Sequence, residues 1–500
     1  MYFNSELSSN FSLARLICIC LLVYSFSAQG QTEICDDGID NDGDGRVDFF
    51  DTDCASYYGL SFIVSGGNCT IQPDAANGFS EVGAIFKSKL HTADISSYVM
   101  TGDVDGDGTP EMVLTSRWSQ ALRIISTRSQ QTGSVKFNAG EIKAEFQISG
   151  NESLFSIPAN AKTEFNRIGK LTFENEVILA DINRDGNAEV FSIVGNHKSS
   201  LDAPAVGFFL TGFTYQQGLL QPLFNPVWIG KDRPGVPGIT DFDGDGKAEI
   251  YFKNRIYSAE QGVLLADAGG DWINELNSAP VAVNISGDTK QELVCGNLIY
   301  SVPDLSSRTL QSISVVKDLN AIPGLNPQLK YFPKVLNDPQ RYGITNLSST
   351  SVADVNGDGF LDVVITGAVE NYMGSGAVFF WNQRLDQVSV FVPSDTNHPF
   401  GWPWGAGRVN LSDADGDGKL NLNFISGDKL FSLKELAGVL VSNWEQPRTI
   451  NDSRSGVMSC TVFDFDNDRN PEIVYRDSRE VVVIDGKTGT QKLFSSSCQS

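Results

Sequence analysis

Acidic side chains recur in this chain at alternate positions of short loops, a spacing suited to binding a hard cation. The pattern is nine residues long, acid-x-Asp/Asn-x-Asp-Gly-x-x-acid, and seven copies of it occur, some of them degenerate. Calcium takes six to eight oxygen ligands at about 2.3–2.6 Å, and carboxylates on alternate residues of a tight turn converge on one point. The chemistry that these residues predict is therefore calcium coordination.

We number the copies as the first to seventh loops. They begin at Asp103 (DVDGDGTPE), Asp181 (DINRDGNAE), Asp241 (DFDGDGKAE), Asn284 (NISGDTKQE), Asp354 (DVNGDGFLD), Asp413 (DADGDGKLN) and Asp464 (DFDNDRNPE). A single copy could be a solvated turn, but the seven loops hold 23 acids that would repel one another without cations. Magnesium resists dehydration and prefers strict octahedral geometry, so flexible loops of protein oxygens favour calcium.

Each loop is expected to give side-chain oxygens from positions one, three, five and nine and a backbone carbonyl from position seven, while glycine at position six allows a positive φ. The predicted ligands are Asp103, Asp105, Asp107 and Glu111; Asp181, Asn183, Asp185 and Glu189; Asp241, Asp243, Asp245 and Glu249; Asp354, Asn356, Asp358 and Asp362; Asp413, Asp415 and Asp417; and Asp464, Asp466, Asp468 and Glu472.

The copies differ in their ligand sets. The fourth loop has Ser286 at position three and lacks the position-six glycine, so it should bind weakly or not at all. The sixth loop ends in the neutral Asn421, and the seventh has Arg469 in place of the glycine. We expect full occupancy at the first, third and fifth loops.

A further acidic segment lies between Cys35 and Cys54 and contains eight aspartates. It has almost no apolar residues, so bound ions and a disulfide must replace a hydrophobic core. We expect Cys35 to pair with Cys54 and the segment to be a calcium-bound cap or linker. Its predicted metal ligands are Asp40, Asp42, Asp44 and Asp48.

The N-terminus has the layout of a secretory signal. Arg15 precedes an apolar run from Leu16 to Phe26, and small residues follow, with cleavage expected after Gly30. A membrane anchor is the alternative, but the run is shorter than the about 20 residues that a bilayer requires, and no later stretch is long enough. The sequence therefore predicts export and no membrane span after removal of the signal.

Six cysteines remain after the expected cleavage, an even number that permits disulfides in an oxidising compartment. Apart from Cys35 and Cys54, four cysteines remain and allow three connectivities. We favour a bond between Cys69 and Cys498, because closing a ring of blades brings early and late strands together.

Short apolar segments on both sides of the loops predict strands. Val-Ile-Leu-Ala leads into the second loop, and Ala-Glu-Ile-Tyr-Phe leaves the third, which indicates a hairpin around each loop. The loops begin 43 to 78 residues apart, with a mean of about 60, the length of one four-stranded sheet with its connections. A parallel solenoid with calcium repeats is the alternative, but its repeats are much shorter and lack hairpins.

These features predict an all-β fold, a seven-bladed β-propeller with calcium-binding loops in the blade hairpins. The expected organisation is a signal peptide at 1–30, an aspartate-rich, disulfide-closed calcium-binding segment at 31–58 and the propeller at 59–500. The 500-residue chain is 41% hydrophobic, enough to form a core, and its formal charge of −24 repels phosphate backbones and anionic membranes. Nucleic acid is therefore excluded as an expected partner.

The acidic loops resemble the FG-GAP or VCBS repeats of the integrin α-subunit N-terminal propeller and of many secreted bacterial proteins, over about residues 60–500. The resemblance implies calcium in the blade-edge hairpins at the loop positions given above. It rests on the loops, because the Phe-Gly and Gly-Ala-Pro phrases of the family are poorly kept. The segment from Cys35 to Cys54 is similar to an aspartate-rich metal-binding motif of secreted bacterial proteins and, less closely, to a thrombospondin type 3 repeat. Both resemblances imply a secreted or cell-surface setting.

Few residues suggest catalysis. His91, His197 and His398 lie in different repeats, so they form no zinc cluster or proton-transfer pair, and we expect each at the surface or in a loop. Nucleophile-elbow, phosphate-loop and dinucleotide motifs are missing from the sequence. Trp402 and Trp404 lie on a Pro/Gly-rich segment that could stack on a sugar or protein, although packing between blades is the favoured interpretation.

The sequence therefore predicts a secreted calcium-binding propeller that acts as a binding or adhesion module for an extracellular protein or glycan, with structural ions and no enzymatic activity expected. The alternative is an extracellular carbohydrate-active hydrolase or lyase on the same scaffold. Two close carboxylates outside the loops, in a pocket at the propeller axis, would favour that alternative. A structural spacer is a third interpretation.

Overall fold

The computed structural model describes part of the chain, and the structural statements below concern that part. The described residues are 60–65, 68–73, 100–116, 120–127, 130–132, 135–137, 141–159, 161, 169–197, 205–231, 234–269, 278–332, 348–369, 376–393, 407–426, 429–447, 460–464, 470–476 and 480–496.

The described residues form an all-β structure. Helix is limited there to three single 3-10 turns, η3 (Glu152–Leu154), η5 (Leu319–Ala321) and η6 (Pro327–Leu329). None of the described helices is long and apolar enough to cross a membrane. The architecture therefore follows from how the strands pair and how the sheets pack.

Seven sheets of four or more strands follow one another along the described chain, and we number them in that order. Sheet 1 contains β3 (Met100–Gly102), β4 (Glu111–Ser116), β5 (Ala121–Ile125) and β8 (Ile142–Gln147). Sheet 2 contains β9 (Lys170–Ala180), β10 (Glu189–His197), β11 (Ala205–Gln216), β12 (Leu219–Pro222) and β13 (Val227–Gly230). Sheet 3 contains β14 (Gly238–Thr240), β15 (Glu249–Phe252), β16 (Arg255–Ser258), β17 (Leu264–Asp267) and β22 (Gln311–Ser312).

The remaining large sheets have the same meander of antiparallel strands at their centre. Sheet 4 contains β19 (Val281–Val283), β20 (Glu292–Cys295), β21 (Leu298–Ser301) and β23 (Ser314–Asp318). Sheet 5 contains β18 (Ser278–Ala279), β24 (Tyr331–Phe332), β25 (Ser348–Ala353), β26 (Asp362–Val369), β27 (Gly376–Asn382) and β28 (Gln387–Phe391). Sheet 6 contains β29 (Asn410–Ser412), β30 (Asn421–Ser426), β31 (Lys429–Leu436) and β32 (Val439–Pro447).

Sheet 7 contains β33 (Thr461–Phe463), β34 (Glu472–Arg476), β35 (Glu480–Asp485) and β36 (Gln491–Ser496). Two hairpins stand apart from the seven sheets: β1 (Leu60–Ser65) with β2 (Asn68–Pro73), and β6 (Gln130–Thr132) with β7 (Val135–Phe137). The strands expected around the second and third loops are therefore confirmed, because β9 ends immediately before the second loop and β15 begins at the last residue of the third.

Each acidic loop joins the two leading strands of one sheet in the same register. The residue before the loop pairs with the residue at loop position nine, as Gly102 does with Glu111 and Ala353 with Asp362. The same register recurs in the other five sheets. A nine-residue insertion with a fixed register makes the loops equivalent in position, so they can be compared residue by residue.

The core lies between consecutive sheets. Successive residues of a strand point to opposite faces, so Val363 and Ile365 pack against sheet 4, whereas Val364 packs against sheet 6. Apolar clusters of this kind join sheets 1 and 2, 2 and 3, 3 and 4, 4 and 5, 5 and 6, and 6 and 7. Both faces of the inner strands are buried, which explains their continuous apolar runs.

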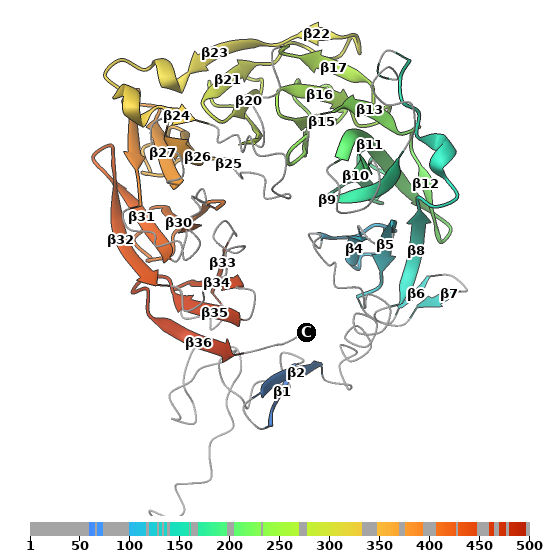
Figure 1. Cartoon of the computed structure of the whole chain (residues 1–500), viewed down its shortest axis with the longest axis horizontal. Helices are drawn as coiled ribbons and strands as arrows, with labels where there is room; N and C mark the ends of the chain where they lie inside the picture. The colour runs from blue at the N-terminus through green and yellow to red at the C-terminus, as the bar shows by residue number, and fades with distance from the viewer. Residues whose placement is uncertain are drawn as a thin grey trace, which may run out of the picture.

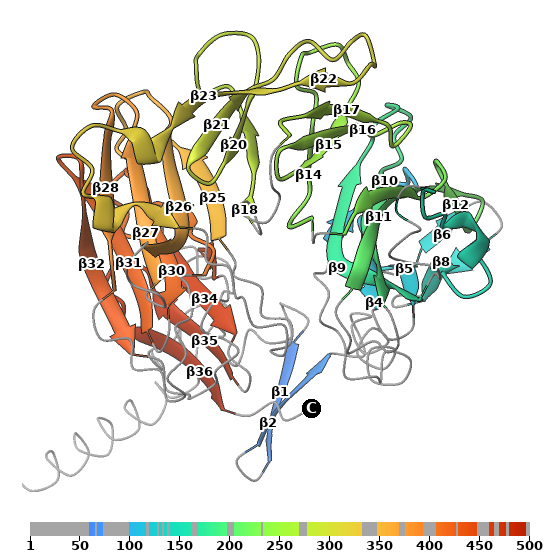
Figure 2. The same cartoon turned by 45° about the horizontal axis from the view of Figure 1, so that its top comes forward.

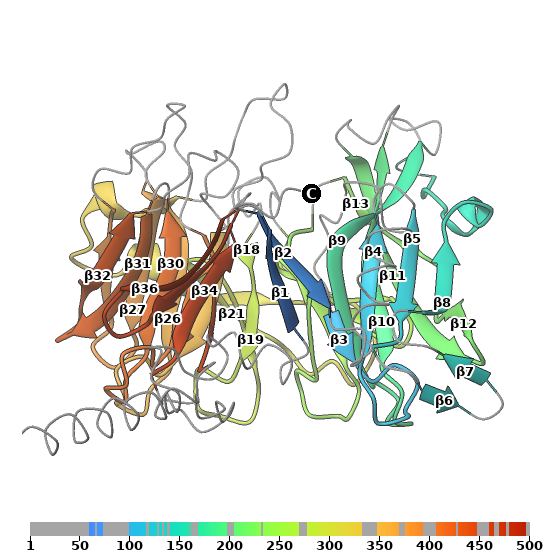
Figure 3. The ribbon, with the colours of Figure 1, turned by 90° about the horizontal axis from the view of Figure 1, so that it is seen from below.

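The sheets succeed one another in a curved row from sheet 1 to sheet 7 (Figure 1), and the tilted view shows neighbouring sheets facing each other (Figure 2). The β1–β2 hairpin lies between sheet 7 and sheet 1 in two views (Figures 1 and 3). Strand β2 contacts β36, the last strand of sheet 7. The all-β architecture is consistent with a β-propeller-like fold.

Candidate metal centres

The aspartate at loop position one closes each turn. In the first loop the two carboxylate oxygens of Asp103 accept hydrogen bonds from the backbone N–H groups of Asp107, at 3.1 Å, and Gly108, at 2.8 Å. The second, third, fifth and sixth loops repeat this pair of bonds at 2.8–3.1 Å. Position one therefore organises the backbone through its side chain, the usual role of Asp in a turn.

The side chain at loop position nine is buried beneath the loop. One oxygen of Glu111 accepts from the N–H of Val104 at position two, at 3.0 Å, and the corresponding bond in the second to sixth loops measures 2.8–3.2 Å. In the first loop a carboxylate oxygen of Glu111 also lies within 4.8 Å of ligand oxygens of Asp103 and Asp105. Position nine therefore holds the loop to its own hairpin and can also offer one ligand oxygen.

Two loop positions have left-handed backbone conformations. Position six has φ between 82° and 91° in the five described loops that carry glycine there, as the sequence predicts. Position four also has a positive φ, between 60° and 77°, in the first to sixth loops. Arg184 occupies position four of the second loop with φ of 60°, so that residue takes a conformation that glycine adopts without strain. The requirement at position four was missed from the sequence, although glycine recurs there.

Three loops gather carboxylates closely enough to hold a metal ion. The ligand atoms of three acids lie within 4.8 Å of one another in each of these sets: Asp103, Asp105 and Glu111; Asp241, Asp243 and Asp245; Asp413, Asp415 and Asp417. All the donors are oxygens, which suits a hard cation. The fold therefore brings together three predicted ligands in each of the first, third and sixth loops.

Burial makes several of the position-nine carboxylates costly to ionise. Burial raises the pKa of Glu249 to about 7 and that of Asp362 to about 6, and it also raises the pKa of Glu189. Each of these side chains is fully buried at position nine. A cation beside them would offset the cost of burying the charge, so the position-nine acids fit a metal site.

The second and fifth loops have asparagine at position three, and no basic side chain contacts their acids in the described structure. Asn183 donates to Asp185 at 3.1 Å and to Glu189 at 3.2 Å, and Asn356 donates to Asp358 at 3.2 Å. In the second loop these contacts join positions three, five and nine through a neutral side chain, and in the fifth loop they join positions three and five. An asparagine can present its carbonyl oxygen instead of its amide nitrogen, so these donor sets fit a hard cation.

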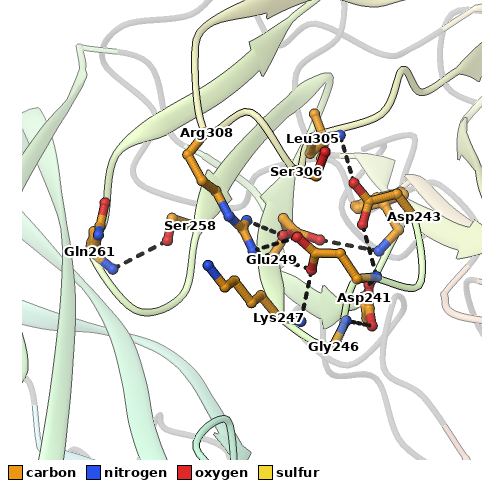
Figure 4. A network of polar contacts seen from close by, with 12 residues as sticks. Asp241, Asp243, Gly246, Lys247, Glu249, Ser258, Gln261, Leu305, Ser306 and Arg308 are labelled. Atoms are coloured by element: carbon orange, nitrogen blue, oxygen red, sulfur yellow. Dashed lines mark hydrogen bonds and ion pairs between the residues drawn. The ribbon is translucent and has the colours of Figure 1, made fainter.

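The third loop contains a basic side chain from a distant segment. Arg308 contacts Glu249 through Nη1, and its Nη2 lies 3.3 Å from both carboxylate oxygens of Asp245. The backbone N–H of Leu305 donates to Asp243 at 2.6 Å. Figure 4 shows Arg308 directed at Glu249 and Leu305 placed over Asp243. Three of the four predicted ligands of this loop thus contact the distant segment that contains Leu305 and Arg308.

The fourth and sixth loops depart from the acidic pattern as the sequence indicates. In the fourth loop Ser286 donates its hydroxyl to Glu292 at 3.0 Å. In the sixth loop the neutral Asn421 accepts from the N–H groups of Ala414, at 2.8 Å, and Asp415, at 3.1 Å. The amide therefore keeps the structural role of the position-nine carboxylate with one negative charge fewer.

Loops of neighbouring sheets lie side by side. The position-eight N–H of the second loop donates to the carbonyl of Asp103 in the first, at 3.1 Å. The position-eight N–H groups of the fourth and sixth loops donate to the position-two carbonyls of the third and fifth loops, each at 3.3 Å. The loops thus form bridges between sheets, and an ion that ordered one loop would also order its contact with the next.

Several predicted residues lie outside the described part of the chain. They are Cys35, Cys54 and the acidic segment between them with Asp40, Asp42, Asp44 and Asp48, together with Asp466, Asp468, Arg469, His91, His398, Trp402, Trp404 and Cys498. Of the seventh loop, Asp464 and Glu472 are described, and Lys492 lies 2.7 Å from Glu472. The metal role of the seventh loop therefore stays a prediction.

The expectation for His197 is wrong. His197 ends β10, is buried, and its Nε2 lies 3.3 Å from Oε1 of Glu174 in the neighbouring strand β9. The strand is buried on both faces because sheet 2 packs between sheets 1 and 3, so a residue placed on it cannot reach the surface. The sequence did not indicate this pair, because its members are 23 residues apart and meet only when the two strands pair.

Cys295 and Cys460 lie in different apolar clusters, one between sheets 3 and 4 and the other between sheets 6 and 7. Both are buried and form no disulfide in the described structure. Cys69 lies on β2, which contacts β36, the strand that ends two residues before Cys498. The bond between Cys69 and Cys498 stays a prediction.

The cavity bordered by Leu319, Trp381 and Val388 is lined by apolar side chains and two asparagines. Its lining contains no carboxylate, whereas the two carboxylates of a glycoside hydrolase would favour the enzyme alternative. This cavity therefore belongs to the core between sheets 4 and 5.

Comparison with solved structures gives several matches at low identity. The V. cholerae biofilm matrix protein Bap1 is 13% identical, with a TM-score of 0.36 over 80% of this chain and 79% of that chain. The Bacillus licheniformis rhamnogalacturonan lyase PL11 is 12% identical, with a TM-score of 0.38 over 76% of this chain and 70% of that chain. The Pseudomonas aeruginosa PilY1 C-terminal domain is 13% identical, with a TM-score of 0.32 over 77% and 80%. At these scores the likeness carries no argument about function.

Comparison with curated proteins gives no match. The FG-GAP repeat model matches residues 346–381. These residues include β25, the fifth loop, β26 and most of β27, so the match covers the hairpin around one complete acidic loop. The predicted resemblance is confirmed at this segment, and the chain contains an FG-GAP repeat in sheet 5.

Proposed function

We propose that the protein is a secreted, seven-bladed β-propeller in which each of the seven sheets is one blade, its acidic loops bind structural calcium, and the assembly serves as a binding or adhesion module for an extracellular protein or glycan. The observation that carries the proposal is the equivalence of the loops. Each stands in the first hairpin of its sheet in one register, and in the first to sixth loops the position-nine side chain accepts from the N–H at position two.

Calcium is favoured over other cations by the donor set. The loops offer carboxylate, amide and backbone oxygens on a flexible turn, and calcium accepts variable numbers of oxygens, whereas magnesium demands a strict octahedron. The ions are assigned a structural role because the position-nine acids are buried and the loops bridge neighbouring sheets. Calcium bound there would order the bridges and leave the outer surface for a ligand.

Metal content is the direct test. The full chain is equilibrated with calcium or magnesium, separated from unbound ions and analysed by inductively coupled plasma mass spectrometry. We expect more than one calcium per chain and little magnesium under the same conditions. A chain that retained no calcium would overturn the metal assignment.

The recognition role is tested on glycan and protein arrays, probed with calcium present and again after chelation. Retention on a defined group of extracellular ligands, reduced by chelation, supports the binding module. Release of shortened polysaccharide would instead support the carbohydrate-active hydrolase or lyase. Secretion is tested by sequencing the exported protein, whose first residue is expected to be Gln31.

A further inference from the structure

The first loop already contains a cation supplied by the protein. The ammonium nitrogen of Lys143 contacts Asp105, lies 3.0 Å from Glu111 Oε1 and lies 3.7 Å from Asp107 Oδ2. The Lys143 side chain is 0% exposed and that of Asp105 is 2% exposed. A buried ammonium among three carboxylates is a paired charge, and the pairing raises the pKa of Lys143 despite its burial.

A β-bulge places Lys143 there. In the pairing of β5 with β8, Ile125 pairs with Ile142 and Ile124 with Ala144, so Lys143 is the extra residue between them. A bulge redirects the side chain of its extra residue. Strand β8 is the outermost strand of the meander in sheet 1, and the bulge directs its lysine to the loop between the first two strands of the same sheet.

The same bulge occurs in other sheets with other residues. In sheet 7 the extra residue is Lys492, which contacts Glu472 of the seventh loop, and in sheet 6 it is Asn443, which donates to Asp415 at 3.1 Å. In sheets 3 and 4 the extra residues are Leu265 and Val316, which are apolar. The bulge is therefore a recurrent position from which a blade can supply a positive charge, a neutral donor or neither to its loop.

Lys143 contacts the oxygens that a metal would need. The other oxygen of Glu111 accepts from Val104, and both oxygens of Asp103 accept backbone N–H groups. Glu111 Oε1 and the carboxylates of Asp105 and Asp107 are the other predicted side-chain ligands, and all three lie beside the ammonium. A divalent ion bound to the same oxygens would lie within a few ångströms of a fixed positive charge, which disfavours its binding.

We infer that Lys143 is the resident cation of the first loop, so that this loop closes without calcium, whereas the second and fifth loops depend on bound metal. The inference deepens the proposed function and rests on it. It departs from the sequence-based expectation of full calcium occupancy at the first loop. The first loop is thereby independent of calcium, and the second and fifth loops respond to its concentration.

Calcium counts on the full chain test the inference with three variants. Lys143→Met keeps an apolar stem of similar length and removes the charge, and we expect it to bind one calcium more per chain than the wild type. Asp105→Asn weakens the first loop as a metal site, and we expect it to leave the count unchanged. Asp354→Asn makes the same Asp-to-Asn change at position one of the fifth loop, and we expect it to lose one calcium.

Local hydrogen exchange supplies a readout that does not depend on the count. On chelation, we expect the amides of Asp358 and Gly359, which donate to Asp354, to exchange faster. We expect the amides of Asp107 and Gly108 in the first loop to keep their protection. This comparison uses the wild type alone, so it stands even if a variant fails to fold.

The inference is overturned if Asp105→Asn lowers the calcium count by one, if folded Lys143→Met binds no additional calcium, or if chelation deprotects the first loop. These outcomes differ from a failure of the proposed function, which is a wild type that binds no calcium. In that case the part that concerns the second and fifth loops fails, and Lys143→Met still decides the part that concerns the first loop, because a gain of one calcium supports it and no gain overturns it.

Discussion

We predict that the fifth loop stabilises the protein more strongly when calcium is bound, and that Asp354→Ala removes this calcium-dependent stabilisation. Asp354 accepts from the N–H groups of Asp358, at 2.9 Å, and Gly359, at 2.8 Å, and is also a predicted ligand. The substitution therefore removes two backbone contacts in every condition and one calcium ligand only when calcium is present. The two losses separate when unfolding is compared with and without the ion.

The magnitudes follow from the two kinds of loss. Loss of the hydrogen bonds at an exposed turn is expected to cost about 1–3 kcal/mol in chelator. Loss of a bound ion adds about 2.7 kcal/mol when free calcium is a hundredfold above its dissociation constant. For a unit of about 440 residues, an unfolding entropy of about 2.1 cal/mol/K per residue converts that additional loss to a Tm decrease of about 3 °C.

Differential scanning calorimetry in millimolar calcium and in chelator measures both losses of stability as decreases in Tm. The matched control is Asn284→Ala in the fourth loop, which removes an acceptor of the Gly287 N–H at 2.8 Å from a loop expected to bind weakly or not at all. We expect the control to lower Tm equally in both conditions. If Asp354→Ala also lowered Tm equally in both, the metal assignment of the fifth loop would be refuted.

Further predictions concern the loop backbone and the cysteines. Gly359→Ala should cost about 1–2 kcal/mol in chelator, from left-handed strain alone, because φ is 87° and no heavy atom lies within 4 Å of the added carbon. Gly486→Ala should lower Tm further in the same calorimetric scan, because its added carbon would clash with two backbone carbonyl oxygens. Burial raises the pKa of Cys460 to about 12, so a thiolate-directed reagent at pH 8 should label it only after unfolding, as counted by mass spectrometry. Non-reduced peptide mapping should find Cys35 bonded to Cys54; either cysteine bonded elsewhere would contradict the prediction.

Much of the blade architecture could be predicted from the sequence because it is encoded locally. Apolar residues on both sides of nine-residue acidic loops indicate hairpins, and the strands begin and end at those loops, as β9 does at Ala180 and β10 at Glu189. The position-six glycines were identified for the same reason, since a left-handed turn leaves its signature at one residue. The burial of His197 was not predictable in this way, because it depends on which sheets cover β10.

The sequence alone determined which residues form each loop. Only the tertiary structure decided which basic side chains contact the loop carboxylates. Positions one, five, six and nine lie within one turn and its hairpin, so their spacing sets the geometry. Lys143 is 32 residues from Glu111, and Arg308 is 59 residues from Glu249. The positions of Lys143 and Arg308 at the loops depend on strand register, on a bulge and on the packing of neighbouring sheets, all of which bring distant segments together. Spacing within a loop therefore predicts where a cation can sit, but long-range pairing decides whether the protein supplies that cation itself.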